Sequence, residues 1–126
     1  MDRRLFFKTL VLTIASFSFK IFPSIKKQTI SFNFGVASGD PTNTHVILWT
    51  KLSGVINSLQ DVSWEVSSDR NFQNIISQGV TAALKQNDYT VKVDAKIPMI
   101  FNGKNIFYRF KANDQTSAVG TTMTLP

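Results

Sequence analysis

The chain has 126 residues, a formal net charge of +6 and a hydrophobic fraction of 43%. This length allows one ordinary domain with an appendage, and the apolar content argues against a wholly disordered chain. The sequence contains no cysteine and a single histidine. Thiolate catalysis, disulfide scaffolds, zinc sites that need sulfur and polyhistidine metal centres are therefore excluded.

The positive charge is concentrated at the N-terminus. Residues 1–27 carry a net charge of +5, whereas residues 28–126 carry only +1. A strongly basic domain would suggest nucleic acid or an anionic membrane as a partner. Because the basicity belongs to the leader and the rest is nearly neutral, we expect no nucleic-acid partner.

Residues 1–27 have the pattern of an export signal. A positively charged start precedes the uncharged residues 9–19, which span about 16 Å as a helix, roughly half of a bilayer's hydrocarbon core. This length disfavours a transmembrane span and favours a signal helix. Four residues match the twin-arginine translocation motif, which this segment resembles: Arg3, Arg4, Phe6 and Lys8. Asp2 stands where that motif has Ser or Thr, and Phe7 where it often has Leu.

The leader therefore predicts recognition by the translocation machinery and a periplasmic or extracellular location. No small-x-small cleavage site follows residues 9–19, so no scission point is assigned. The alternative is a basic amphipathic helix that stays attached to the chain at the membrane surface.

From Ile30 onward the hydrophobic period changes to two, which is typical of strands with one buried face. Seven segments show strand-like patterns between turn-forming residues: 30–36, 45–51, 61–67, 75–82, 89–95, 106–112 and 118–125. We therefore predict an all-β fold, an Ig or fibronectin III-like antiparallel β-sandwich of about seven strands over residues 30–126. Trp49 and Trp64 are expected to anchor the core, and Tyr108 to be an ordered tyrosine.

Residues 35–41 form the densest cluster of small and turn-forming residues. A phosphate-binding loop needs a helix N-terminus after its glycines, and here another strand follows instead. We interpret Gly39, Asp40 and Pro41 as a corner between strands. In this interpretation Gly39 supplies an unusual φ and the Asp40 carboxylate binds local amides.

No candidate catalytic or metal site emerges from the remaining polar residues. His45 opens a strand without a second histidine or a carboxylate at metal-ligand spacing, so a structural role is favoured. Ser38, Asp40 and His45 have the residue types of a hydrolase triad, but no nucleophile elbow surrounds Ser38. Carboxylates are scattered over turns and polar strand faces. Basic residues on the strands are expected to be mainly solvated: Lys92, Lys96, Arg109 and Lys111.

One part of the sequence is distinctive, because residues 34–41 read FGVASGDP and residues 46–51 read VILWTK. Shorter blocks follow at 62–66, 90–94, 107–110, 117–120 and 124–126. Together they resemble the opening of the PhoD-type alkaline phosphatases, over about residues 32–126. The motif positions with an expected structural role are Gly35, Ser38, Gly39, Asp40, Pro41, Trp49, Trp64 and Tyr108. Lys51 departs from the usual arginine, and Thr121 and Met123 replace an arginine-rich pattern.

The resemblance implies an Ig or fibronectin-like N-terminal domain, which in this family precedes a metallophosphatase domain that binds iron and calcium. No family ligand or catalytic residue maps onto this sequence, so we expect no catalysis and no cofactor in this chain. The expected function is that of an accessory domain whose partner is the catalytic domain. The alternative is a free-standing exported β-sandwich that binds a partner or a surface polymer. A phosphatase of this chain alone is disfavoured, since two-metal hydrolysis needs several converging carboxylates and imidazoles.

Overall fold

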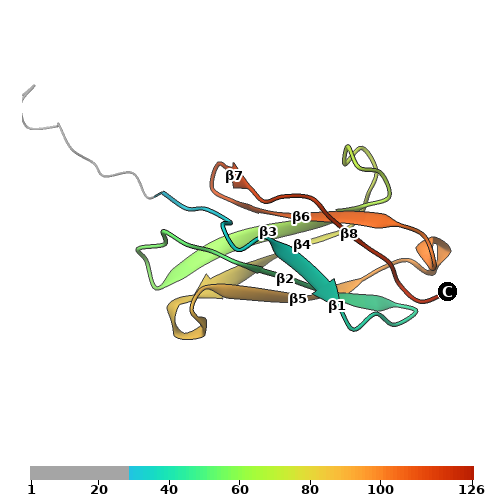
Figure 1. Ribbon diagram of the computed structural model, residues 1–126, viewed down its shortest axis with the longest axis horizontal. Helices are drawn as coiled ribbons and strands as arrows, with labels where there is room; N and C mark the ends of the chain where they lie inside the picture. Colours follow the sequence, from blue (N-terminus) through green and yellow to red (C-terminus); the bar gives the residue numbers. More distant parts are fainter. Residues whose placement is uncertain (1–28) are drawn as a thin grey trace, which may run out of the picture.

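The computed structural model describes residues 29–126 (Figure 1). The predicted leader, with Arg3, Arg4, Phe6 and Lys8, lies outside the described residues, so the signal helix stays a prediction. Over residues 29–126 no helix is long and apolar enough to span a bilayer.

Two antiparallel sheets make up the fold, which agrees with the predicted all-β class. The strands are β1 (Val36–Gly39), β2 (His45–Lys51), β3 (Leu59–Ser67), β4 (Ile75–Leu84), β5 (Thr90–Lys96), β6 (Ile106–Ala112), β7 (Gln115–Thr116) and β8 (Gly120–Thr122). One sheet has the order β1-β2-β5; in the other, β4-β3-β6 continues to β7, and β8 also pairs with β6. Two 3₁₀ turns, η1 (Lys85–Asn87) and η2 (Met99–Phe101), lie in the connections.

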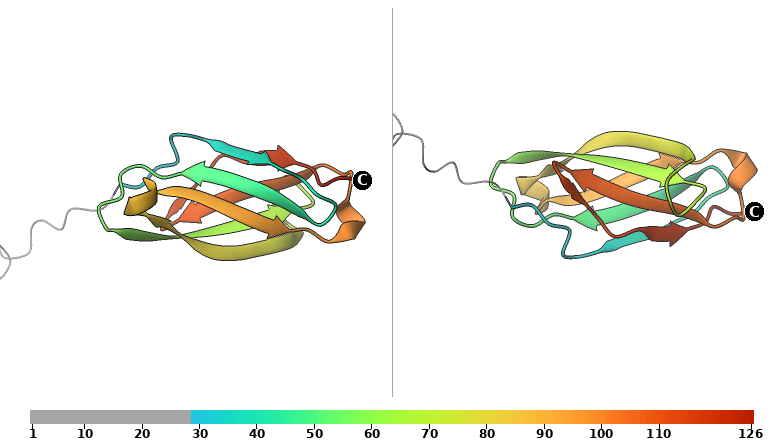
Figure 2. Two further views of the ribbon diagram at one scale, coloured as in Figure 1. Left: turned by 90° about the horizontal axis from the view of Figure 1, so that it is seen from below. Right: turned by 90° about the horizontal axis from the view of Figure 1, so that it is seen from above.

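The sheets pack face to face as a sandwich, which Figure 2 shows from two sides. Every second residue of the main strands points into the space between them, as the period of two requires. In β2, for example, Val46, Leu48 and Thr50 are buried, while the residues between them are half-exposed. The buried cluster lies wholly within residues 29–126, so this segment contains its own hydrophobic core. Its largest fully buried side chain is Phe110.

The first expected strand, residues 30–36, is wrong in its position. Ser31 makes only an isolated bridge with Ser53, and the first strand begins at Val36. A turn ends the extended stretch, because the Gly35 amide donates to the Phe32 carbonyl at 3.1 Å. Gly35 has a φ of 73°, a conformation that glycine adopts without steric cost.

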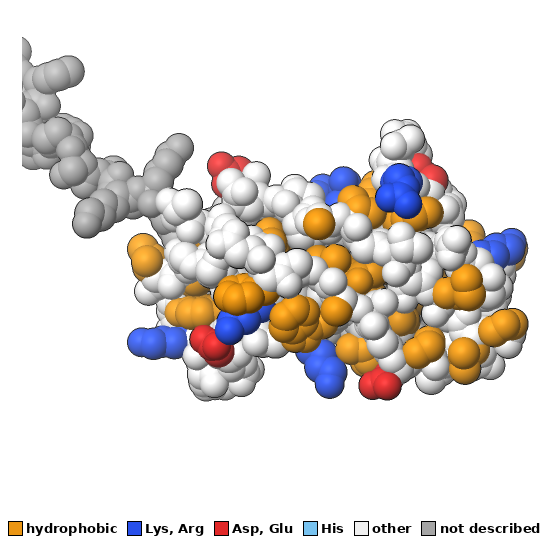
Figure 3. All heavy atoms as spheres, in the orientation of Figure 1, with side chains coloured by type: hydrophobic (Ala, Val, Ile, Leu, Met, Phe, Trp, Pro, Cys, Tyr) orange, Lys and Arg blue, Asp and Glu red, His pale blue; other side chains and the backbone are white. Residues whose placement is uncertain are grey.

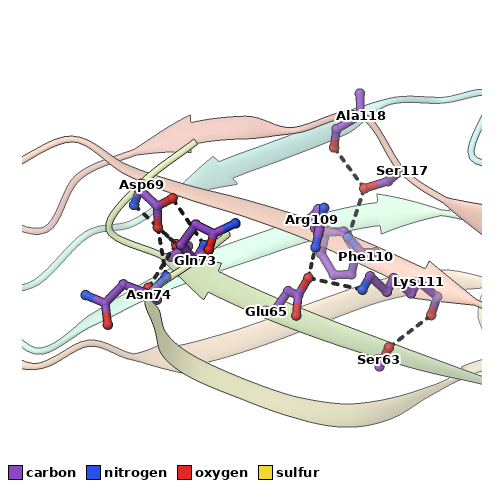
Figure 4. A network of polar contacts seen from close by, with 11 residues as sticks. Ser63, Glu65, Asp69, Gln73, Asn74, Arg109, Phe110, Lys111, Ser117 and Ala118 are labelled. Carbon is purple, nitrogen blue, oxygen red and sulfur yellow. Dashed lines mark hydrogen bonds and ion pairs between the residues drawn. The ribbon is translucent and has the colours of Figure 1, made fainter. Parts of the chain in front are cut away.

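The last expected strand, residues 118–125, is also too long, since only Gly120–Thr122 form β8. A side chain interrupts the strand pairing just before it. The Ser117 hydroxyl accepts the Phe110 amide at 2.8 Å and donates to the Ala118 carbonyl at 2.8 Å (Figure 4). These two hydrogen bonds, which we call the Ser117 clip, lie between the two-residue β7 and β8. Both strands pair with β6.

The two tryptophans are not the core anchors that the sequence suggested. Trp49 lies at an odd position of β2, opposite Ala37 and Lys92, and therefore faces the outside of its sheet, half-buried. Trp64 packs against the margin of the core. A Cβ on its cross-strand neighbour Gly79 would come within 2.9 Å of the indole. The strand register explains the outward position of Trp49, whereas Trp64 shares the inward face of β3 with Val62 and is only half-buried.

Candidate docking surface

The turn between β1 and β2 contains Asp40 and Pro41, and Gly39 ends β1. The unusual φ belongs to Asp40, at 46°, and not to Gly39 as the sequence suggested. The expected local bonds come from Thr42 instead of Asp40. Its hydroxyl accepts the amides of Thr44 at 3.2 Å and His45 at 2.9 Å. Threonine hydroxyls stabilise turns in this way.

Three distant motif blocks meet at one buried tyrosine. Tyr108 of β6 is only 2% exposed, pairs with Gly120 of β8, and has the Ser38 side chain of β1 near enough to influence its pKa. A Cβ at Gly120 would overlap the ring and come within 2.6 Å of Tyr108 Oη, so the ring needs a glycine opposite. Burial raises the pKa of Tyr108 above its usual value of 10.0, and the Ser38 interaction offsets part of this rise. We call Ser38, Tyr108 and Gly120 the tyrosine seam.

The seam and the turn do not form a catalytic triad. The Ser38 side chain interacts with Tyr108, while His45 Nδ1 lies 2.8 Å from Thr44 Oγ1. Within residues 29–126 no group of three His, Cys, Asp or Glu side chains is placed to hold a metal ion. The described residues therefore do not fit the iron and calcium set that the family resemblance implies for a catalytic domain.

A polar network ties the outer face of β3 to β6 (Figure 4). The Glu65 carboxylate accepts a hydrogen bond from Arg109 Nε at 2.5 Å and lies 3.4 Å from Lys111 Nζ. The guanidinium of Arg109 also stacks on Phe72 at 3.9 Å. Since Arg109 and Lys111 share Glu65, they are ion-paired rather than free to form a basic patch. Lys92 belongs to β5, in the other sheet.

The loop that carries Phe72 is held by Asp69 (Figure 4). Its carboxylate accepts the Ser67 hydroxyl at 2.7 Å and the amides of Asn74 at 2.9 Å and Gln73 at 3.1 Å. These bonds, with the Ser67 hydroxyl as the largest contribution, lower the pKa of Asp69 below its usual value of 3.8. Every oxygen of this carboxylate is occupied by local donors, so its role is structural.

Figure 3 shows apolar side chains over several parts of this face, including the end of the sandwich where the last residues lie. In η2, Met99 is 64% and Ile100 is 72% exposed. In the last residues, Met123 is 41% and Leu125 is 49% exposed. We call these four side chains the apolar end.

Hydrogen bonds fix the last residues against this end, which also holds the β1–β2 turn and η2 (Figures 1 and 2). The Leu125 amide donates to the Thr42 carbonyl at 2.9 Å, and the Gly103 amide donates to the Thr124 carbonyl at 3.0 Å. The Thr124 hydroxyl adds a bond of 2.9 Å to Asn102 Oδ1. The turn of the distinctive motif therefore supports the last residues of the sandwich.

Met123 was named from the sequence as a departure from an arginine-rich family pattern, but sequence reasoning did not single out the other three residues of the apolar end. Its signal is the run from Ile97 to Phe101, an apolar stretch in a connection, whereas most other connections contain polar turn formers. Only the fold shows that Met99 and Ile100 remain exposed while Ile97 is buried.

Comparisons with known proteins agree on one family. The PhoD-like phosphatase N-terminal domain matches residues 18–126. Alkaline phosphatase D of Bacillus subtilis (strain 168) is 34% identical over 125 residues, which cover 94% of this chain and 21% of that protein. A solved structure of PhoD superimposes with a TM-score of 0.72 and 35% identity, over 82% of this chain and 20% of that one. The chain thus spans about one fifth of the length of these relatives.

Proposed function

The chain belongs to the PhoD-like phosphatase family, whose N-terminal domain it matches, and we propose that it acts as the non-catalytic accessory domain of such a phosphatase. The match over residues 18–126 carries this proposal. The curated relative is an alkaline phosphatase of which the chain spans one fifth. Hydrolysis of phosphoesters would belong to the metallophosphatase domain that accompanies this domain in the family, together with its calcium and iron.

The physical role proposed for the sandwich is to pack against that catalytic domain and stabilise it. The chain supplies no converging metal ligands over residues 29–126, whereas metal-assisted hydrolysis needs several of them. The sandwich type, Ig or fibronectin III-like, is part of the same proposal. It is supported by the two antiparallel sheets and by a buried tyrosine on a late strand.

A chimera tests the accessory role. Residues 29–126, which contain their own core, replace the matching segment of B. subtilis alkaline phosphatase D, and phosphatase activity is compared with that of a variant lacking the segment. We expect the chimera to restore activity at least 10-fold over the deletion. A chimera no better than the deletion, or equal rescue by an unrelated sandwich of the same size, contradicts the proposal.

The chain alone provides the second arm of this test. Purified and supplied with calcium and iron, the full 126-residue chain is expected to hydrolyse neither phosphomonoesters nor phosphodiesters above the blank. Measured turnover that copurifies with the chain would overturn the assignment of catalysis to another domain.

Export through residues 1–27 completes the proposed function. The charge of +5 in the leader and the four twin-arginine motif matches support it. Replacing Arg3 and Arg4 together with lysine retains the charge and is expected to block export, which is measured by cell fractionation. Unchanged export of this double variant contradicts the twin-arginine assignment, whereas a Lys26→Arg control should be exported normally.

A further inference from the structure

We propose that the apolar end, formed by Met99, Ile100, Met123 and Leu125, is the surface on which the catalytic domain docks. This inference rests on the proposed function and adds to it the face of contact. Four large apolar side chains with exposures of 41–72% flank the hydrogen bonds that join Thr124 to Asn102 and Gly103. Clustered apolar groups that remain in water mark contact surfaces, unlike apolar residues scattered singly over a surface.

The matched family suggests the occupant, the catalytic domain. The match is to an N-terminal domain and covers 21% of alkaline phosphatase D. About four fifths of that relative therefore lie outside the matched domain. The last matched residue here is Pro126, whose ring lies 3.5 Å from the position of a Cβ on Gly103. A domain that continues from this point begins beside η2 and the apolar end.

The hydrogen bonds of the last residues limit where such a domain lies. The Leu125 amide is bound to Thr42, and the Thr124 carbonyl is bound to Gly103. The last residues of the matched domain are therefore held beside the apolar end.

The surroundings of the apolar end also fit an interface. Lys96 and Lys104 are exposed at the two ends of the connection that contains η2. An apolar centre with polar side chains at its margin is the usual composition of protein interfaces. Val80, on the outer face of β4, is equally exposed at 72%. It lies in mid-strand opposite Ser63, away from the chain end, and provides a matched control.

Calorimetry of the chimera tests this surface. Docking is expected to raise the melting temperature of the sandwich by about 5 °C relative to residues 29–126 alone. Ile100→Asp and Leu125→Asp should abolish this rise, because each places a charge in the apolar contact. Neither substitution should change the melting temperature of the isolated sandwich by more than about 2 °C, since both side chains are exposed. Ile100→Leu and the control Val80→Asp should retain the rise.

The outcomes separate the two proposals. If the unsubstituted chimera restores no activity, the accessory role itself fails. If the chimera is active and its sandwich is stabilised, but Ile100→Asp and Leu125→Asp retain the full rise, the docking surface is wrong. Loss of the rise in Val80→Asp alone would place the contact on the β3–β4 face instead and would also overturn this inference.

Discussion

The tyrosine seam and the apolar end are both built from sequence-distant segments, yet they use apolar surface in opposite ways. In the seam, Tyr108 is 2% exposed and fits against Gly120 with no room for a Cβ. At the apolar end, Ile100 leaves 72% of its surface in water. The first arrangement stabilises the fold, whereas the second leaves apolar surface in water, which we propose the catalytic domain covers. Substitutions in the two regions should therefore separate folding from binding.

The largest effect is expected in the interior next to the seam. Phe110→Ala removes the largest fully buried side chain, and such truncations cost about 4 kcal/mol of unfolding free energy. Trp49→Ala removes a larger side chain, but one that faces outward and is half-buried. We expect it to cost about 1 kcal/mol. Urea denaturation measures both values, and a larger loss for Trp49→Ala would contradict the observed strand register.

A glycine pair tests the seam itself. Gly120→Ala places a methyl group into the Tyr108 ring, and overpacking of this kind costs about 3 kcal/mol. Gly39→Ala is the matched control, because a Cβ at that position would meet no atom within 4 Å and its φ is not positive. Thermal unfolding should show a decrease of about 15 °C for the first variant and almost no change for the second. Equal melting temperatures would argue against the close approach.

The dependence of stability on alkaline pH also tests the tyrosine seam, with a smaller expected effect. The folded-state pKa of Tyr108 is raised above 10.0 by burial. The unfolded chain therefore releases this proton first, and stability is lost as pH rises from about 10 through the higher folded pKa. Tyr108→Phe removes the ionisable phenol, so this variant should not show that loss. Its stability relative to the unsubstituted chain should rise above pH 10, and a constant difference from pH 7 to 11 would contradict the raised pKa.

A small effect is also predicted for the loop over the outer face of β6. The pKa of Asp69 is lowered by the Ser67 hydroxyl and the Asn74 and Gln73 amides. Its contribution to stability is present above pH 3.8 and is lost as pH falls through the lower folded pKa. Asp69→Asn should lower the melting temperature slightly at pH 7 and should reduce the decline below pH 3.8. Unfolding curves between pH 2 and 7 measure this change.

Substitutions at the apolar end should change the stability of the isolated sandwich less than substitutions in the interior. Met99→Ser is expected to disturb little packing, because most of the side chain is exposed, at 64%. We expect the stability of the isolated sandwich to change by no more than about 0.5 kcal/mol. A loss as large as that of Gly120→Ala would mean that Met99 stabilises the fold rather than a contact with another domain.

Much of the fold could be predicted from the period of two, because one buried face leaves a clear pattern in the sequence. The segments 45–51 and 106–112 coincide with β2 and β6. The ends of the sandwich could not be predicted in this way. The turn at Gly35 and the Ser117 clip depend on single hydrogen bonds to Phe32 and Phe110, and hydrophobic patterning carries no information about such bonds.

The candidate docking surface was harder to predict from the sequence than the strands were. The sequence indicates a corner between strands at residues 39–41, and the fold shows that Thr42, which follows them, is bonded to Leu125. Exposure, however, is a property of the assembled fold. The buried Ile97 and the exposed Ile100 occur in the same short connection, and only their placement at the end of the sandwich distinguishes them.

Hydrogen exchange of the active chimera tests the docking claim most directly. Amide exchange is compared, peptide by peptide, between the chimera and residues 29–126 alone. The account predicts slower exchange in the chimera for residues 97–103 and 123–126, with no change for residues 78–82 around Val80. Unchanged exchange at the apolar end, together with protection on the β3–β4 face or nowhere on the sandwich, would contradict it.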